Sequence, residues 1–153
     1  MTPAEPLLRV VPDPNILVSA TVSVLGMPAA IVLAWGTGAF ELIVSDHLLD
    51  ELRDVLMRPK FRRYRTEEEV TAYVESFRVA TIIADPPTRR IVPPDERDDY
   101  LMLLGQAAGA DCILSGDRHL TTLTNPNPPV FTPRDFYALL VGRGQAPVRQ
   151  WPS

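Results

Sequence analysis

Hydrophobic positions along the chain alternate between short apolar runs and longer segments with helical spacing. The apolar runs predict strands at 7–11, 40–44, 81–84, 112–115 and 130–131. Segments with a helical pattern lie between and after them, at 28–35, 45–56, 66–80, 98–108 and 132–141. Because strands joined through helices run in the same direction, this order predicts an α/β fold with a parallel sheet covered on both faces.

Capping residues and helix breakers support these boundaries. Ser45 is predicted to cap the second helix, and Thr66 with Glu69 forms the pattern of a capping box. Gly109 is predicted to end the helix that begins near residue 98. The sequence Pro-Asp-Pro-Asn at 12–15 interrupts the first apolar run and predicts a turn directly after the first strand.

Length and composition favour one soluble domain. A chain of 153 residues is long enough to bury a core, and we expect a domain at 7–141 followed by a flexible tail at 142–153. No apolar run approaches the length of a membrane span, and the first residues lack the pattern of a signal peptide. The single cysteine fits a reducing compartment, so a cytoplasmic protein without a membrane partner is expected.

The net charge of −4 does not by itself indicate a nucleic-acid-binding protein. The charges are unevenly distributed, however. Five of the 15 basic residues lie in one short stretch, and acidic residues crowd positions 95–99. The basic stretch is either a solvated loop or a rim that binds phosphates, and it consists of Arg58, Lys60, Arg62, Arg63 and Arg65.

Several acidic residues lie where a parallel sheet would bring them together. Asp13 and Asp117 both follow predicted strands, Asp98 begins a helix, and Glu51 lies two turns into the helix after the second strand. Each has an ordinary structural explanation as a turn, cap or surface residue. Ligands of open α/β sheets bind beyond the carboxyl ends of the strands, so the four are expected to share one crevice.

Carboxylates in one crevice repel one another unless a cation neutralises them. Mg²⁺ and Mn²⁺ prefer oxygen ligands of this kind, and either ion suits the hydrolysis of phosphodiester bonds. The acidic set therefore predicts a nuclease that uses Mg²⁺ or Mn²⁺.

Four segments, in order, resemble the motifs of PIN domains. They begin with Val-Val-Pro-Asp-Pro-Asn at 10–15 and Ser-Asp-His-Leu-Leu-Asp-Glu-Leu at 45–52, and continue with 95–99 and 108–117. The resemblance covers roughly residues 8 to 140 and implies a three-layer α/β/α sandwich with a central, mainly parallel sheet. It also implies that the acidic quartet and its supporting residue are Asp13, Glu51, Asp98, Asp117 and Asn15. Asp98 is favoured over its acidic neighbours by its distance from the following helix.

In this respect the chain resembles the toxin components of type II (VapBC-like) toxin–antitoxin systems. That resemblance implies an endoribonuclease with RNA as substrate, a small antitoxin as partner, and a homodimer. One position departs from the pattern: the family usually carries Thr or Ser between the first Asp and the Asn, and this chain has Pro14. The missing hydroxyl favours a catalytically weak or silent PIN-like binding module as the alternative.

A haloacid-dehalogenase-like phosphatase is a second alternative, because that class also places an Asp-x-Asp motif after its first strand. Asn15 is a poor replacement for the second acid of that motif. The lysine that such chemistry needs has one candidate here, Lys60 in the basic stretch. The sequence therefore favours the nuclease.

Overall fold

The computed structural model describes residues 6–86 and 96–151, with the backbone alone for 96–99. Within these residues five strands form one parallel sheet, in the order β3-β2-β1-β4-β5. The strands are β1 (Arg9–Pro12), β2 (Glu41–Val44), β3 (Thr81–Ile82), β4 (Cys112–Leu114) and β5 (Val130–Phe131). The helices are α1 (Pro14–Val22), α2 (Met27–Gly36), α3 (Asp46–Leu56), α4 (Pro59–Arg62), α5 (Glu67–Ser76), α6 (Glu96–Ala108), α7 (Arg118–Thr121) and α8 (Pro133–Gly142), with a 3-10 turn at Phe77–Val79. The predicted parallel α/β fold is confirmed.

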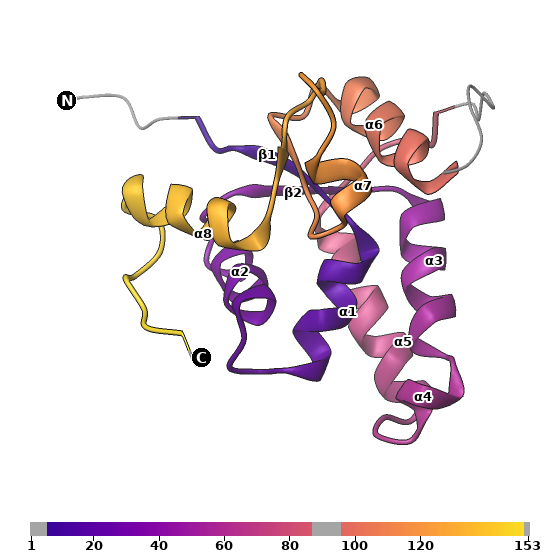
Figure 1. Cartoon of the computed structure of the whole chain (residues 1–153). Helices are drawn as coiled ribbons and strands as arrows, with labels where there is room; N and C mark the ends of the chain where they lie inside the picture. Colours follow the sequence, from indigo (N-terminus) through magenta and orange to yellow (C-terminus); the bar gives the residue numbers. More distant parts are fainter. Residues whose placement is uncertain (1–5, 87–95, 152–153) are drawn as a thin grey trace.

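Helices cover both faces of the sheet (Figure 1). α6 packs against β1 and β4 from one face, whereas α1, α2, α3 and α5 lie together on the opposite side. The central strands are sealed between these layers, and Val10, Val11 and Ile113 have no exposed surface. The direction in which strands are added changes after β3: β2 and β3 lie on one side of β1, and β4 and β5 lie on the other. The sheet therefore has its switch point between β1 and β4, where ligand crevices of such folds open.

The predicted helix ends agree with the structure at most positions. Ser45 caps α3 by accepting from the Leu48 amide, and Thr66 and Glu69 form the complete capping box of α5. Gly109 ends α6 with a φ of +61°, a left-handed backbone conformation that favours glycine.

The first strand does break at residues 12–15, as predicted, but the break is the start of a helix and not a simple turn. Asp13 is the N-cap of α1, and Pro14 occupies the first helical position, where its missing N–H costs nothing. Pro12 is accommodated at the end of a central strand for a related reason. The Asp13 amide donates to the Leu114 carbonyl of β4. Because successive backbone amides of a strand point to opposite neighbours, the nitrogen of Pro12 points toward β2. The last residue pair between β1 and β2 is Val10 with Leu42, so position 12 lies beyond it. The missing donor of Pro12 therefore interrupts no bond of the sheet.

The short helices α4 and α7 were not predicted either, since four residues are too few to show a helical period. Gly142, the first residue of the segment expected to be a flexible tail, is the last residue of α8. Beyond it, Trp151 packs edge-on against Tyr137 with 5.0 Å between ring centroids. In the part of the chain that the structure describes, no single helix is long and apolar enough to cross a membrane. The helices α1 and α2, which form a bent pair, meet that length and composition only when they are taken together.

Candidate functional site

Polar residues follow the strands along the carboxyl edge of the sheet. Asp13 comes directly after β1, Ser115 directly after β4 and Ser45 directly after β2, and Asp85 lies three residues beyond β3. Because neighbouring parallel strands end at the same edge, the strand order places these residues in the sequence Asp85, Ser45, Asp13, Ser115. The edge thus carries two polar clusters, one on each side of β1.

The first cluster joins Asp13 to Asp117 through Ser115. The Ser115 hydroxyl, which has no exposed surface, donates to Asp13 Oδ2 at 2.8 Å and accepts from the Asp117 amide at 3.0 Å. Asp13 Oδ1 accepts from the Asn15 amide at 3.0 Å, and Asp117 Oδ1 accepts from the His119 amide at 2.9 Å. Both aspartates are therefore fixed at helix N-termini on the two sides of the switch point.

Asp13 is a buried carboxylate, 7% exposed, and it makes no ion pair with the described part of the chain. An uncompensated buried charge is costly, and hydrogen bonds alone offset that cost only in part. Asp13 therefore has the surroundings expected of a carboxylate whose charge is neutralised by a bound cation.

Glu51 lies half-buried on α3, one turn after His47 on the same face of the helix. Its charge acts on the hydroxyl of Tyr100, a residue of α6. Burial is the main cause of the raised pKa of Tyr100, and the charges of Asp85 and Glu51 add to it. The His47 ring also packs on the Tyr100 ring, so the face of α3 that carries His47 and Glu51 is the one directed toward α6.

Asp98 is the third residue of α6, but its side chain lies outside the described residues, as do those of its acidic neighbours at 95–99. It lies two residues before the buried Tyr100, whose hydroxyl contacts residues at the carboxyl edge of the sheet. Among the described side chains, no group of three His, Cys, Asp or Glu residues converges closely enough to hold a metal ion. The structure therefore joins Asp13 to the backbone of Asp117 through Ser115. The roles of Glu51, Asp98 and Asp117 as partners of Asp13 in one site are proposals.

Asn15 contributes to the cluster through its backbone. Its amide binds Asp13, while its side chain is exposed on the first turn of α1. The exposed side-chain amide of Asn15 lies next to Asp13, where it could contact a ligand. A supporting role for Asn15 is therefore a proposal.

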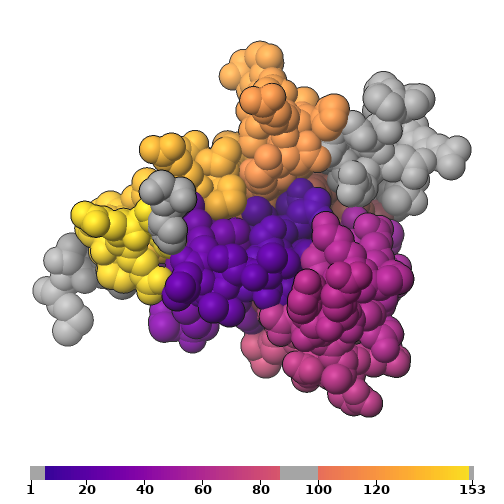
Figure 2. Space-filling model, turned by 60° about the horizontal axis from the view of Figure 1, so that its bottom comes forward, coloured from indigo at the N-terminus to yellow at the C-terminus, as the bar shows by residue number. Residues whose placement is uncertain are grey.

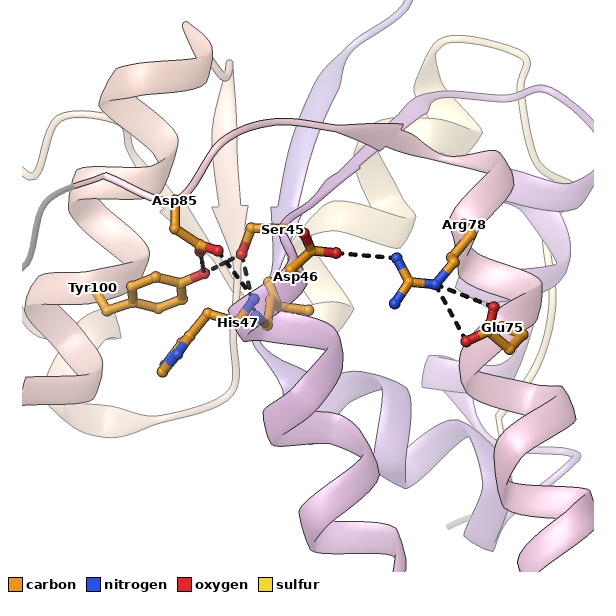
Figure 3. A network of polar contacts seen from close by, with 8 residues as sticks. Ser45, Asp46, His47, Glu75, Arg78, Asp85 and Tyr100 are labelled. Atoms are coloured by element: carbon orange, nitrogen blue, oxygen red, sulfur yellow. Dashed lines mark hydrogen bonds and ion pairs between the residues drawn. The ribbon is translucent and has the colours of Figure 1, made fainter.

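The second cluster was not predicted from the sequence. The Tyr100 hydroxyl donates to Asp85 Oδ1 at 2.6 Å and contacts the Ser45 hydroxyl, as Figure 3 shows. The His47 amide donates to Asp85 Oδ2 at 3.1 Å. Burial raises the pKa of Asp85, but the hydrogen bonds from Ser45, Tyr100 and His47 outweigh it and hold that pKa below its ordinary value. Ser45 and Asp85 could have been found from the sequence, because both follow predicted strands. No feature of the sequence around Tyr100 indicates its role.

The basic stretch lies away from the acidic edge. A groove of about 970 Å³ separates the end of α1 from α4, and its basic and aromatic lining consists of Lys60, Phe61, Arg63, Tyr64 and Arg65. Figure 2 shows this face, where the indigo α1–α2 segment lies beside the magenta segment that contains α3 and α4. At 1.5 Å per residue, Val18, the first residue of α1 that lines the groove, lies about 7.5 Å along the helix from Asp13.

The five basic residues differ in their surroundings. Arg65 donates to the Thr21 carbonyl at the end of α1 and is half-buried, so it braces the groove. Arg58, Lys60, Arg62 and Arg63 are exposed. Tyr64, 77% exposed, presents an aromatic ring among these cations. The groove combines positive charge with an exposed ring, the pairing that binds single-stranded nucleic acid.

Cys112 is confined to the core. It lies in β4 without exposed surface, and burial, together with the nearby Asp111 charge, raises the pKa of its thiol to about 12. A thiol of that kind is not a nucleophile at neutral pH. The acidic edge is therefore the candidate site of the chemistry.

The residues at this edge fit a hard divalent cation, because the side chains gathered there offer carboxylate and hydroxyl oxygens. The comparisons with known proteins agree with that chemistry. The uncharacterized protein MJ1680 of Methanocaldococcus jannaschii is 26% identical over 121 residues, which cover 78% of this chain and 77% of that protein. The family model of the PIN domain matches residues 9–119, a span that includes β1 to β4 and every residue of the acidic quartet. PIN domains are generally nucleases and typically depend on divalent metals. The chain belongs to the PIN domain family.

Proposed function

We propose that this PIN domain is a metal-dependent endoribonuclease. The observation that carries the proposal is the buried Asp13 carboxylate, linked through Ser115 to Asp117 at the switch point of the sheet. A carboxylate in that position is costly for folding and useful for holding a cation.

Asp13, Asp117, Glu51 and Asp98 would hold Mg²⁺ or Mn²⁺. When bound, such a cation supplies Lewis-acid activation of water and neutralises charge on the phosphate. Ser115 orients Asp13 by donating to one carboxylate oxygen, which leaves the remaining lone pairs of Asp13 for a ligand. The Asn15 side chain, exposed beside Asp13, is placed to contact the substrate.

The exposed basic residues Arg58, Lys60, Arg62 and Arg63 bind the phosphates of the RNA outside the crevice, with Arg65 as a brace. Because the groove lining begins about 7.5 Å along α1 from Asp13, one strand can contact both the groove and the acidic edge. This arrangement favours a single-stranded RNA, which is flexible enough to follow the surface between them.

The proposal is tested with a single-stranded RNA, a DNA of the same sequence and p-nitrophenyl phosphate, each with Mn²⁺, Mg²⁺ or EDTA. RNA cleavage is expected with either ion and is expected to stop in EDTA. Asp13→Asn should abolish it, whereas Asp54→Asn, which removes an exposed carboxylate of α3, should retain it. Full activity in EDTA, or equal activity of the two variants, contradicts the mechanism.

The same assay distinguishes the alternatives. A phosphatase hydrolyses p-nitrophenyl phosphate in preference to RNA. A silent binding module retains RNA without cutting it, the outcome that the missing hydroxyl at Pro14 favours. Nuclease activity with RNA and not with p-nitrophenyl phosphate supports the proposal over both.

We further propose that the protein is the toxin of a toxin–antitoxin pair, with a small antitoxin as partner and a homodimer as its assembly. The motif order from Asp13 to Asp117 supports this narrower role by its resemblance to that branch. Expression of the wild-type chain in a bacterial host should arrest growth, and Asp13→Asn should relieve the arrest. Normal growth with an active nuclease would contradict the toxin role and leave the nuclease intact.

A further inference from the structure

The Tyr100 hydroxyl joins three elements of the fold at the acidic edge. Tyr100 belongs to α6 and is 5% exposed; its hydroxyl gives its single proton to Asp85, which follows β3. The Ser45 hydroxyl, between β2 and α3, contacts the Tyr100 hydroxyl. One buried hydroxyl thus connects α6 to the ends of β2 and β3 (Figure 3).

The same network holds the first turn of α3. Asp85 Oδ2 accepts from the His47 amide at 3.1 Å, and Ser45 Oγ accepts from the Leu48 amide at 3.1 Å. The His47 ring also packs on the Tyr100 ring, with 4.6 Å between centroids and a 60° tilt. The N-terminal turns of α3 and α6 are therefore fixed to each other by hydrogen bonds and by ring contact.

Both helices carry acids of the proposed metal site. Glu51 lies one turn after His47 on the same face of α3, and Asp98 lies two residues before Tyr100 in α6. A change in the spacing of the two helices moves these two positions relative to each other. Side chains that carry like charges do not hold such a spacing by themselves, because they repel.

We propose that Tyr100 is a positioning residue that, through Ser45 and Asp85, sets the spacing between Glu51 and Asp98 and so determines the affinity of the site for a divalent cation. The inference rests on the proposed function. Residues that orient metal ligands without touching the metal typically change affinity or activity 10–100-fold when they are replaced. The hydroxyl is the relevant group, since a phenyl ring alone would fill the same space.

Tyr100→Phe tests this directly, because it removes the hydroxyl, keeps the ring and leaves the charge unchanged. Tyr137→Phe is the matched control: Tyr137 is 4% exposed, and its hydroxyl donates to the Pro147 carbonyl at 2.7 Å, away from the acidic edge. Mn²⁺ affinity is measured by calorimetric titration, and RNA cleavage at saturating and at low Mn²⁺. Tyr100→Phe should weaken Mn²⁺ binding about 10–100-fold, with much of the activity restored at high Mn²⁺. Tyr137→Phe should bind Mn²⁺ as the wild type does.

Wild-type Mn²⁺ affinity in Tyr100→Phe would overturn the inference while the nuclease proposal stands. No Mn²⁺ binding and no RNA cleavage by the wild type would overturn both. If Tyr100→Phe does not fold, Asp85→Ala replaces it, since the Asp85 side chain is exposed and accepts the same hydroxyl. Asp50→Ala, which removes an exposed carboxylate of α3, controls for the loss of charge. Weaker Mn²⁺ binding in Asp85→Ala than in Asp50→Ala supports the inference, and equal binding contradicts it.

Discussion

Ser115→Ala should destabilise the protein even without a metal ion. The hydroxyl is completely buried and makes two hydrogen bonds, to the Asp13 carboxylate at 2.8 Å and from the Asp117 amide at 3.0 Å. A bond to a charged acceptor contributes about 1.5–3 kcal/mol and a neutral one about 1 kcal/mol. Alanine no longer buries a hydroxyl, so the expected loss in the free energy of unfolding is about 2–3 kcal/mol.

The loss is measured by urea unfolding at pH 7 in EDTA. Since urea slopes for small proteins are about 1–3 kcal/mol/M, the midpoint should fall by about 1 M. Ser76→Ala is the control, because that exposed hydroxyl donates only to the Tyr73 carbonyl of its own helix; it should cost less than about 0.5 kcal/mol.

A double-mutant cycle with Asp13→Asn identifies the cause. In Asp13→Asn the Asn15 amide retains its acceptor, but the Ser115 hydroxyl loses a charged one. Ser115→Ala should therefore cost about 1.5 kcal/mol less in that background than in the wild type. Additive effects, or a Ser115→Ala loss equal to that of Ser76→Ala, would refute the idea that Ser115 holds a buried charge in place.

Three further predictions concern activity, RNA binding and pH. Pro14→Thr should raise the rate of RNA cleavage by restoring a hydroxyl beside Asp13, at a cost of about 0.4–1 kcal/mol from the lost proline; an unchanged rate would show that the hydroxyl does not limit the reaction. Arg62→Ala with Arg63→Ala should flatten the salt dependence of RNA affinity by roughly 0.7 per lost phosphate contact, and an unaltered slope would make the stretch ordinary surface. Hydrogen bonds hold the folded pKa of Asp85 below its ordinary value of 3.8. Their stabilisation is therefore present above pH 3.8 and lost as the pH falls through the folded pKa, so Asp85→Asn should show a shallower loss of stability in acid.

The sheet was predictable from the sequence because strand and helix signals alternate with clear caps. The start of α1 was not, since Asp13, Pro14 and Asn15 are as suitable for a turn as for a helix N-terminus. The tertiary structure decides between the two: Ile16, Leu17 and Val18 are consecutive and all buried, a pattern without helical period. A helix packed on several sides does not show an amphipathic stripe.

The positions of Asp13 and Asp117 at the carboxyl edge of the sheet were predictable, because both residues follow strands. Ser115 and Tyr100 were missed because their roles depend on distant partners. Ser115 binds a residue 102 positions away, and Tyr100 binds one 55 positions away. Nothing in the residues around Tyr100 distinguishes a hydroxyl that bonds to Asp85 from one that reaches solvent.

Helix capping explains only part of the acidic edge. The residues after β1, β2 and β4 include the N-caps of α1, α3 and α7, which are Asp13, Ser45 and Asp117. An N-cap needs an oxygen that accepts a backbone amide, and serine serves as well as aspartate. Ser45 meets that need without burying a charge. Asp13 meets it at 7% exposure, and Ser115 ties it to a second aspartate, so folding alone would favour a neutral residue there. The charge in excess of what capping requires is the part of this edge that the proposed cation would neutralise.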